Sequence, residues 1–344
     1  MTSKERLLTT LRLQTPDRIP TAFHNSAVVA EMSGVPYDQF FRSGKIMAET
    51  HAKAQNRFGY DGIIIDSGTH CSAETLGCGA AYTDKKYPVT TTPVLKRLDD
   101  IYDLKTPDPN VTFPACEMIQ CVSLLHDHFG DEVALIATGD QGPFTLAALL
   151  LGMESWLMAV KENRQPELLR AVLSFALHYT VTYAIALYQA GADVVRFGDS
   201  FGGTQVVSPR MYYEWTFPYE KECIEMLRPY SFPTSIHICG NATPILEGMV
   251  STGASMIEVD ELSDFQMTCT ACAGKTALLG PISPSNMVFK SYKEIKQEAR
   301  AAIEIARHAG TSLVLGAGCS MAGNTPFDNI DAVIDAAKEY GNYL

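Results

Sequence analysis

The chain of 344 residues is 46% hydrophobic and 19% charged, which is the composition of a folded globular protein rather than of a disordered or low-complexity one. Its 39 acidic and 27 basic side chains give a net charge of -12, which argues against nucleic acid or an anionic membrane as the partner. Small molecules and other proteins remain as partners.

The N-terminal residues show no pattern of an export signal. Lys4, Glu5, Arg6 and Arg12 interrupt short apolar pairs, so the continuous hydrophobic segment of a secretory signal is missing. No later apolar stretch is long enough to be expected to cross a bilayer. The nine cysteines are an odd number in a large chain, which favours reduced thiols over a disulfide framework. We therefore expect a cytoplasmic protein.

Short runs rich in β-forming residues alternate with longer amphipathic stretches along the whole chain. Eight runs predict strands: residues 19–23, 62–66, 133–138, 194–198, 235–238, 256–259, 277–279 and 313–315. Between them, residues 166–190 and 292–309 are typical of helices. The alternation predicts an α/β fold, a single (β/α)8 TIM barrel domain over residues 1–344, although an open doubly wound sheet would need the same alternation.

One segment departs from this regular pattern. Residues 76–132 separate the second and third predicted strands and contain Pro88, Pro93 and Pro114, which are typical of an excursion before the helix predicted near 118–128. We interpret the segment as an insertion between strands 2 and 3 near the barrel mouth, rather than as a separate domain.

The C-terminal ends of the strands are where a barrel gathers its functional side chains. His237 and Cys239 lie two residues apart where the fifth predicted strand gives way to Gly240 and Asn241, so both side chains point to the same face. Cys319 follows the eighth predicted strand in a similar way. One imidazole and two thiols make a ligand set suited to zinc.

Three protein ligands leave one position of a tetrahedral zinc ion open, as in catalytic rather than structural sites. A thiol in that position would lose its proton and become a nucleophilic thiolate, whereas water there would favour hydrolysis. Asp260 or Glu261, after the sixth predicted strand, could supply a fourth ligand that substrate displaces. The sequence therefore predicts a zinc enzyme whose catalytic ligands are His237, Cys239 and Cys319.

Residues of the same types also have commoner structural roles. Buried cysteines often act as small hydrophobic side chains, so the joint occurrence of the three ligands, rather than each alone, carries the hypothesis. Cys269 and Cys272 form a CxxC pair expected to begin a helix, without the second ligand pair that a zinc site of this type needs. Acids near other strand ends could contact substrate, but capping of helices and turns is their commoner role: Asp66, Asp140, Asp199 and Glu258.

The run His-Ile-Cys-Gly-Asn at 237–241, Cys319 after Gly318, and Thr-Pro-Phe-Asp-Asn-Ile at 325–330 resemble the cobamide-dependent methyltransferases of the uroporphyrinogen decarboxylase superfamily. The resemblance begins with Thr-Pro-Asp-Arg-Ile-Pro at 15–20 and runs almost end to end. It is strongest with the zinc-dependent methylcobamide:coenzyme M methyltransferases. The His-x-Cys pair with a distant cysteine is its specific part, because the other pieces are general barrel elements.

This resemblance implies transfer of a methyl group from methyl-cobalt(III) of methylcobalamin or another methylcorrinoid to a zinc-activated thiol such as coenzyme M. It implies Zn2+ bound by His237, Cys239 and Cys319, with an acidic group near Asp260 as a fourth ligand in the resting enzyme. The implied partners are a small corrinoid protein or free corrinoid and a small thiol acceptor, with no nucleic acid and no membrane.

Three alternatives stay open at this point. Transfer to a non-thiol acceptor such as a pterin would use the same methyl donor. A uroporphyrinogen decarboxylase-like lyase is disfavoured, because the arginine-rich N-terminal loop of those enzymes is not apparent at residues 22–26. A corrinoid-binding or carrier-docking protein with structural zinc would need four filled ligand positions.

Overall fold

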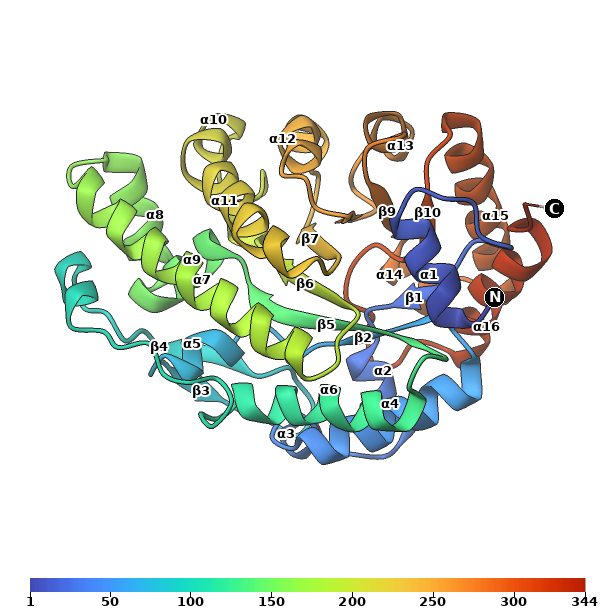
Figure 1. The fold of residues 1–344 in the computed structure, drawn as a ribbon, viewed down its shortest axis with the longest axis horizontal. Coiled ribbons are helices and arrows are strands. Elements are labelled where there is room, and N and C mark those ends of the chain that lie inside the picture. The colour runs from blue at the N-terminus through green and yellow to red at the C-terminus, as the bar shows by residue number, and fades with distance from the viewer. Residues whose placement is uncertain (344) are drawn as a thin grey trace.

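Eight strands, each parallel to its neighbours, close into a barrel in the computed structural model, which describes residues 1–343 (Figure 1). Their order around the barrel follows the chain. A bridge between Thr21 and Leu315 joins the first and last strands, and the N–H of Leu315 donates to the carbonyl of Pro20 at 2.8 Å. The strands are β1 (Ala22–Phe23), β2 (Gly62–Ile65), β5 (Ala134–Gln141), β6 (Val194–Gly198), β7 (Thr234–Ile238), β8 (Met256–Val259), β9 (Ala277–Ile282) and β10 (Leu313–Ala317).

Helices surround these strands. Ser291 and Glu294 form a capping box at the start of α15 (Tyr292–Ala309), and Gly310 ends this helix in the left-handed conformation with φ of 70°. The other helices are α1 (Ser3–Leu11), α2 (Ser26–Met32), α3 (Tyr37–Phe40), α4 (Gly44–Phe58), α5 (Cys71–Thr75), α6 (Ala115–Phe129), α7 (Pro143–Leu151), α8 (Met153–Glu162), α9 (Pro166–Gln189), α10 (Pro209–Met211), α11 (Phe217–Leu227), α12 (Leu246–Ser251), α13 (Phe265–Cys272), α14 (Pro284–Phe289) and α16 (Phe327–Tyr340).

The predicted TIM barrel is confirmed, and the predicted strands differ from the observed ones mainly at their ends. β1 begins at Ala22 rather than at residue 19, and Pro20 just before it has no N–H to donate to a neighbouring strand. β5 continues past Thr138 to Gln141, with an irregular register against β6 over its last residues. Short apolar runs predict where a strand lies better than where its pairing stops.

The segment between β2 and β5 contains an antiparallel hairpin of β3 (Gly79–Ala81) and β4 (Val89–Thr92) and the 3-10 turn Leu98–Tyr102. Figure 1 shows this hairpin beyond the ends of the barrel helices α4 and α6. The helix predicted near 118–128 is α6, which packs against α4 in the outer ring. The bounds of the proposed insertion, residues 76–132, stay a prediction.

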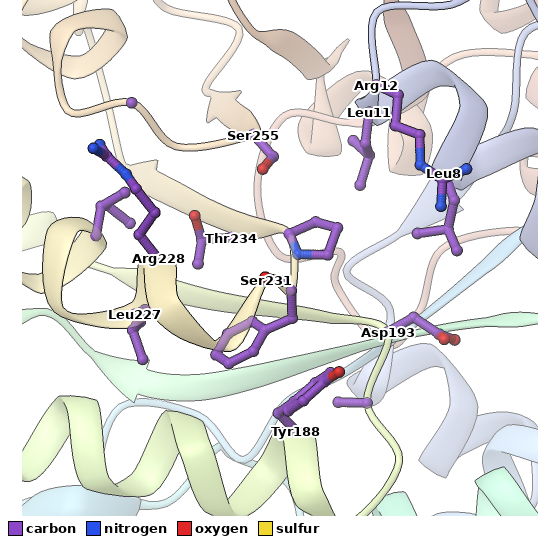
Figure 2. A pocket seen from close by; sticks show the side chains of 15 residues that line it. Leu8, Leu11, Arg12, Tyr188, Asp193, Leu227, Arg228, Ser231, Thr234 and Ser255 are labelled. Carbon is purple, nitrogen blue, oxygen red and sulfur yellow. The ribbon is translucent and has the colours of Figure 1, made fainter.

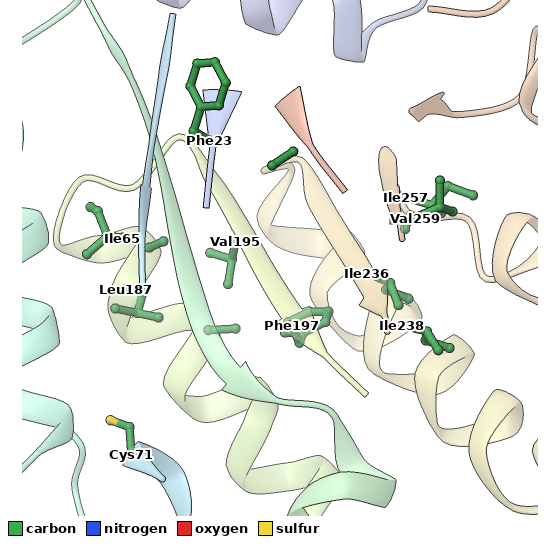
Figure 3. Packing of buried hydrophobic residues seen from close by; sticks show 14 of the residues in the cluster. Phe23, Ile65, Cys71, Leu187, Val195, Phe197, Ile236, Ile238, Ile257 and Val259 are labelled. Atoms are coloured by element: carbon green, nitrogen blue, oxygen red, sulfur yellow. The ribbon is translucent and has the colours of Figure 1, made fainter. Parts of the chain in front are cut away.

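Alternate residues along the strands separate two apolar layers. One side of each strand packs against the helices; Figure 3 shows part of this layer, with Val195 and Phe197 of β6 and Ile236 and Ile238 of β7. The other side points into the barrel, where a smaller cluster fills the amino-terminal half. Its members, together with two leucines of α1, are Leu7, Leu11, Ala22, Ile64, Ala134, Ile136, Val194, Met256, Ala277, Leu279 and Val314.

One helix corrects the expectation that no stretch is apolar enough to cross a bilayer. By length and composition, α9 meets that criterion. Most of its apolar window is buried, and the helix packs against α7, α11 and β5. The outer layer of the barrel therefore accounts for its apolar character.

Candidate metal centre

His237, Cys239 and Cys319 come together at the carboxyl end of the barrel. His237 is on β7 and Cys239 follows it by two residues, while Cys319 lies two residues beyond the end of β10. The loop after β10 passes close to the end of β8 at Gly318. A larger residue would not fit there, because a Cβ at this position would lie 2.7 Å from the carbonyl oxygen of Val259. The sequence prediction that two separate strand ends present one ligand set agrees with this placement.

The three donor atoms are spaced as zinc would require. His237 Nε2 lies 3.1 Å from Cys239 Sγ and 3.6 Å from Cys319 Sγ, and the two sulfur atoms are 3.7 Å apart. Ligands of a tetrahedral zinc ion, with bonds of about 2.0–2.3 Å, lie about 3.4–3.8 Å from one another. Both cysteines are free thiols. The donor types and two of the three spacings fit the ion, and the third is slightly short.

The second nitrogen of His237 also has a partner. Its Nδ1 lies 3.3 Å from the carbonyl oxygen of Glu258 and 3.8 Å from the carboxylate of the same residue on β8. Metal-binding histidines usually donate their other N–H to such an oxygen, which fixes the tautomer and the ring orientation. Nε2 is thus left facing the two sulfur atoms, so it is the nitrogen that could bind a metal.

A buried ion pair supports Glu258 in this position. The Nε of Arg196, two residues into β6, donates to the Glu258 carboxylate, and the guanidinium also approaches His24 Nδ1 at 3.4 Å. His24 Nε2 in turn lies 2.8 Å from the carboxylate of Asp66. This continuous chain of buried groups reaches from β2 to His237, so the ring is held by several strands rather than by β7 alone.

The ionisation of the ligands follows from their contacts. The hydrogen bond from Cys319, assisted by His237, lowers the pKa of the Cys239 thiol, whereas the same bond and burial raise the pKa of Cys319. Burial disfavours a charged His237, but Glu258 and Cys239 outweigh this effect and raise the pKa of the imidazole. The lowered pKa of Cys239 favours its thiolate, which is the form that binds a metal.

A cavity of about 220 Å³ opens beside the three donor atoms. His237, Cys239 and Cys319 line it together with Arg196 and Asp66, and the β3–β4 hairpin contributes Tyr87, Pro88 and Val89. The hydroxyl of Tyr87 lies 3.2 Å from that of Ser320, the neighbour of Cys319. The hairpin thus forms one wall of the cavity and contacts the loop that carries the third donor.

A second cavity, of about 430 Å³, lies at the opposite end of the barrel (Figure 2). Leu8 and Leu11 of α1 line it, as do Thr234 at the start of β7 and Ser255 before β8. These are amino-terminal ends of strands, whereas the ligands predicted from the sequence line the carboxyl-end cavity. Function in a barrel of this type resides at the carboxyl end.

Asp260, the predicted fourth ligand, does not join the cluster of three donors in the described part of the chain. Its two carboxylate oxygens accept the N–H groups of Gly240 at 2.9 Å and Leu262 at 3.1 Å. Glu261 accepts the hydroxyl of Ser283 at 3.1 Å. In this structure Asp260 holds the turn that follows Cys239, and its backbone bonds direct the carboxylate there.

The rival cysteine pair lies elsewhere. Cys269 and Cys272 are in the second half of α13 rather than at its start, and both are buried. Burial raises the pKa of each thiol to about 12, so they remain neutral at physiological pH. They pack as small hydrophobic side chains, as their commoner role suggests.

Two functional groups of the site were not recognised in the sequence. Arg196 was not singled out, and capping or turn formation was the favoured expectation for Glu258 over substrate contact, yet both are buried beside His237. The signal was the two-residue period: Arg196 follows the inward-facing Val194 by two, and Glu258 follows Met256 by two. Charged residues at inward positions of a barrel strand indicate a polar interior at that level.

Comparison with known proteins shows the family of this chain. The uroporphyrinogen decarboxylase (URO-D) family matches residues 2–340. The chain belongs to that family. Within it, a methylcobamide:CoM methyltransferase MtbA of Methanosarcina acetivorans is 27% identical over 98% of both chains. A methylcobamide:CoM methyltransferase MtaA of Methanosarcina barkeri is 25% identical over 98% of both chains.

Other members and solved structures extend this picture. A uroporphyrinogen decarboxylase of Prochlorococcus marinus is 27% identical over 83% of this chain and 80% of its own. A methyltransferase from Methanosarcina mazei superposes with a TM-score of 0.90, at 23% identity and 99% coverage of both chains. At that identity the structural likeness establishes the barrel fold.

Proposed function

We propose that this protein is a methyltransferase that moves a methyl group from a methylcorrinoid to a small thiol at a zinc site. The observation that carries the proposal is the convergence of His237, Cys239 and Cys319 beside an open cavity. Relatives named methylcobamide:CoM methyltransferases, which match over nearly the whole chain, support the same methyl donor and acceptor.

The donor set suits this chemistry. His237 and the two cysteines offer three donors within 4.8 Å of one another, so a tetrahedral ion would keep one position for an incoming ligand. When bound, zinc would favour the thiolate form of an acceptor thiol at neutral pH, where a free thiol with pKa of about 8.5 is mostly protonated. A structural zinc site would instead need a fourth protein ligand, whereas the carboxylate of Asp260 accepts backbone N–H groups of Gly240 and Leu262.

The overall reaction balances without an added oxidant or reductant. The carbon–cobalt bond breaks and leaves its electron pair on cobalt, which goes from the +3 to the +1 state. A lone pair of the acceptor sulfur forms the new carbon–sulfur bond, and the thiol proton passes to solvent. The contribution of the chain is to orient the sulfur, which the buried bonds of Arg196, Glu258 and His237 serve by holding the site rigid.

The size of the cavity favours a small acceptor. At about 220 Å³ it is smaller than the roughly 300–1,000 Å³ of sites for drug-sized ligands. Coenzyme M or a thiol of similar size suits this space better than a pterin. The methyl donor would approach from the barrel mouth, as free corrinoid or on a small corrinoid protein.

The nine cysteines are free thiols, which agrees with the reducing cytoplasm that we infer as the compartment.

The test combines metal content with turnover. Zinc is measured by elemental analysis in the wild-type protein and in Cys239→Ala, and demethylation of methylcobalamin is followed by absorbance with and without coenzyme M. We expect near-stoichiometric zinc in the wild type only, and thiol-dependent formation of cobalt(I). Zinc without turnover would redirect the search to other acceptors, including pterins. A zinc-free wild type after metal-replete purification would contradict the proposal and favour a lyase.

A further inference from the structure

The two sulfur atoms of the candidate metal centre differ in their surroundings. The hydroxyl of Ser200 donates a hydrogen bond to Cys239 Sγ at 3.0 Å. The corresponding hydroxyl near the other sulfur, that of Ser320, instead pairs with the hydroxyl of Tyr87 at 3.2 Å. Within residues 1–343, a hydroxyl bond to a ligand sulfur is thus confined to Cys239.

The backbone around Ser200 is held in place by several hydrogen bonds. Ser200 begins the 3-10 turn Ser200–Gly202 after β6, and its carbonyl accepts the N–H of Gly203 at 3.2 Å. The preceding residue, Asp199, donates its N–H to the carbonyl of His237 at 2.9 Å. The Asp199 carboxylate accepts the N–H of Thr145 at 2.7 Å. Asp199, next to Ser200 in the chain, is therefore bonded both to β7 and to α7.

A hydrogen bond to a thiolate changes what the sulfur can donate. Bonds from neutral donors to an ionised acceptor are among the strong ones, and they draw electron density away from the acceptor. Hydrogen bonding around a cysteine sulfur tunes the properties of the metal that it binds. A sulfur that donates less leaves the metal a stronger Lewis acid toward the ligand in its open position.

We propose that Ser200 is a positioning residue that orients Cys239 and weakens its electron donation to the bound metal. This inference rests on the zinc site of the proposed function. It divides the two thiolates by role: Cys239 is the weaker donor and Cys319 the stronger one. Ser200, which causes this difference, lies in the turn after β6, a strand that supplies none of the three predicted ligands.

Cobalt(II) in place of zinc makes the effect visible. The full-length protein is stripped with a chelator, loaded with Co2+ alone, and its sulfur-to-cobalt charge-transfer absorption is recorded. In Ser200→Ala the sulfur becomes more electron-rich, so the band is expected at longer wavelength than in the wild type. Ser200→Thr keeps the hydroxyl and should restore the wild-type band.

Ser320→Ala is the matched control, because it removes a hydroxyl from the same cavity without removing a bond to sulfur. Its band should coincide with that of the wild type. Competition with a chelator tests the orienting role: loss of an outer partner that positions a metal ligand weakens binding by about 10–100-fold, so Ser200→Ala should release cobalt at least about tenfold more readily although its sulfur donates more strongly.

The outcomes separate this inference from the function on which it rests. If wild-type protein with Co2+ shows no sulfur-to-cobalt band, the metal site itself is wrong. If the wild type shows the band and Ser200→Ala leaves both band and metal retention unchanged, the role of Ser200 is refuted while the site stands. Equal shifts in Ser200→Ala and Ser320→Ala would also refute it, because the effect would then be a general one of the cavity.

Discussion

The two halves of the barrel interior are built from the same strands and have opposite chemistry. The amino-terminal half is apolar, with Val194, Met256 and Ile64 pointing inward. Two residues further along the same strands stand Arg196, Glu258 and Asp66, all of them buried. One two-residue step along each strand thus separates a layer that stabilises the barrel from one that can hold a metal site.

The comparison shows how the barrel combines stability with a polar site. α1 closes the apolar end with Leu7 and Leu11, which completes a buried apolar core. At the other end the buried charges lie in contact, Arg196 with Glu258 and His24 with Asp66, because an unpaired buried charge would be strongly destabilising. Changes in the polar layer at the carboxyl end should therefore affect metal binding. Changes in the apolar layer at the amino-terminal end should affect folding alone.

The largest effect is expected at a ligand. Cys319→Ala removes one of three donors, so thiol-dependent turnover should fall by more than the roughly 10–100-fold that loss of an outer partner costs, with loss of zinc. Cys272→Ala, in the buried pair of α13, is the control and should keep its zinc. Elemental analysis and methylcobalamin assays on both variants decide this. Retention of zinc by Cys319→Ala would contradict the assignment.

Breaking the buried ion pair should destabilise the fold strongly. Arg196→Met leaves Glu258 buried without its partner, which we expect to lower the free energy of unfolding by about 3–5 kcal/mol. Arg196→Met combined with Glu258→Met removes both charges and should recover most of that loss in denaturant titrations. Turnover should stay impaired in the double variant, because His237 loses the carboxylate behind it. A double variant as unstable as the single one would show that the charges are not the cause.

A buried acid at the end of β5 should make stability depend on pH. Burial raises the pKa of Asp140 to about 7, above its ordinary value of 3.8, so its ionised form is disfavoured in the folded chain. The stability associated with the neutral acid is complete below pH 4 and is lost as pH rises toward 7. Asp140→Asn should therefore be more stable than the wild type at pH 8, by on the order of 1 kcal/mol per unit of pKa shift.

Measuring the stability of the wild type and of Asp140→Asn at two pH values tests this prediction. Denaturant titrations at pH 4 and pH 8 should show a difference that appears only at the higher pH. Asparagine also accommodates the positive φ of 63° at this position, so backbone strain should not obscure the result. An equal difference at both pH values would assign the effect to packing instead of ionisation.

The smallest effect is expected in the apolar layer. Ile136→Val removes one methylene from the inward cluster and should lower the free energy of unfolding by about 0.5–1.5 kcal/mol. Zinc content and turnover should match the wild type, since Ile136 precedes by two residues the position of β5 that lines the cavity at the carboxyl end. A loss of zinc in this variant would mean that the two layers are not independent.

Much of the site was accessible from the sequence because its signals are local. His237 and Cys239 share a strand face, and a glycine-bounded run places Cys319 at another strand end. The alternation of strands and helices predicted a barrel, although an open doubly wound sheet would show the same alternation. Local patterns could not reveal which partner each buried charge would find, and Arg196 was missed because its meaning depends on Glu258, 62 residues away.

The sequence by itself thus determined the order of strands and helices and the end of the barrel at which His237, Cys239 and Cys319 meet, since these depend on period and spacing. Only the tertiary structure showed that the Asp260 carboxylate accepts the N–H groups of Gly240 and Leu262, and that Ser200 contacts Cys239. Both outcomes depend on how loops from different strands meet over the barrel mouth. Closure of the barrel sets that geometry, and no single segment encodes it.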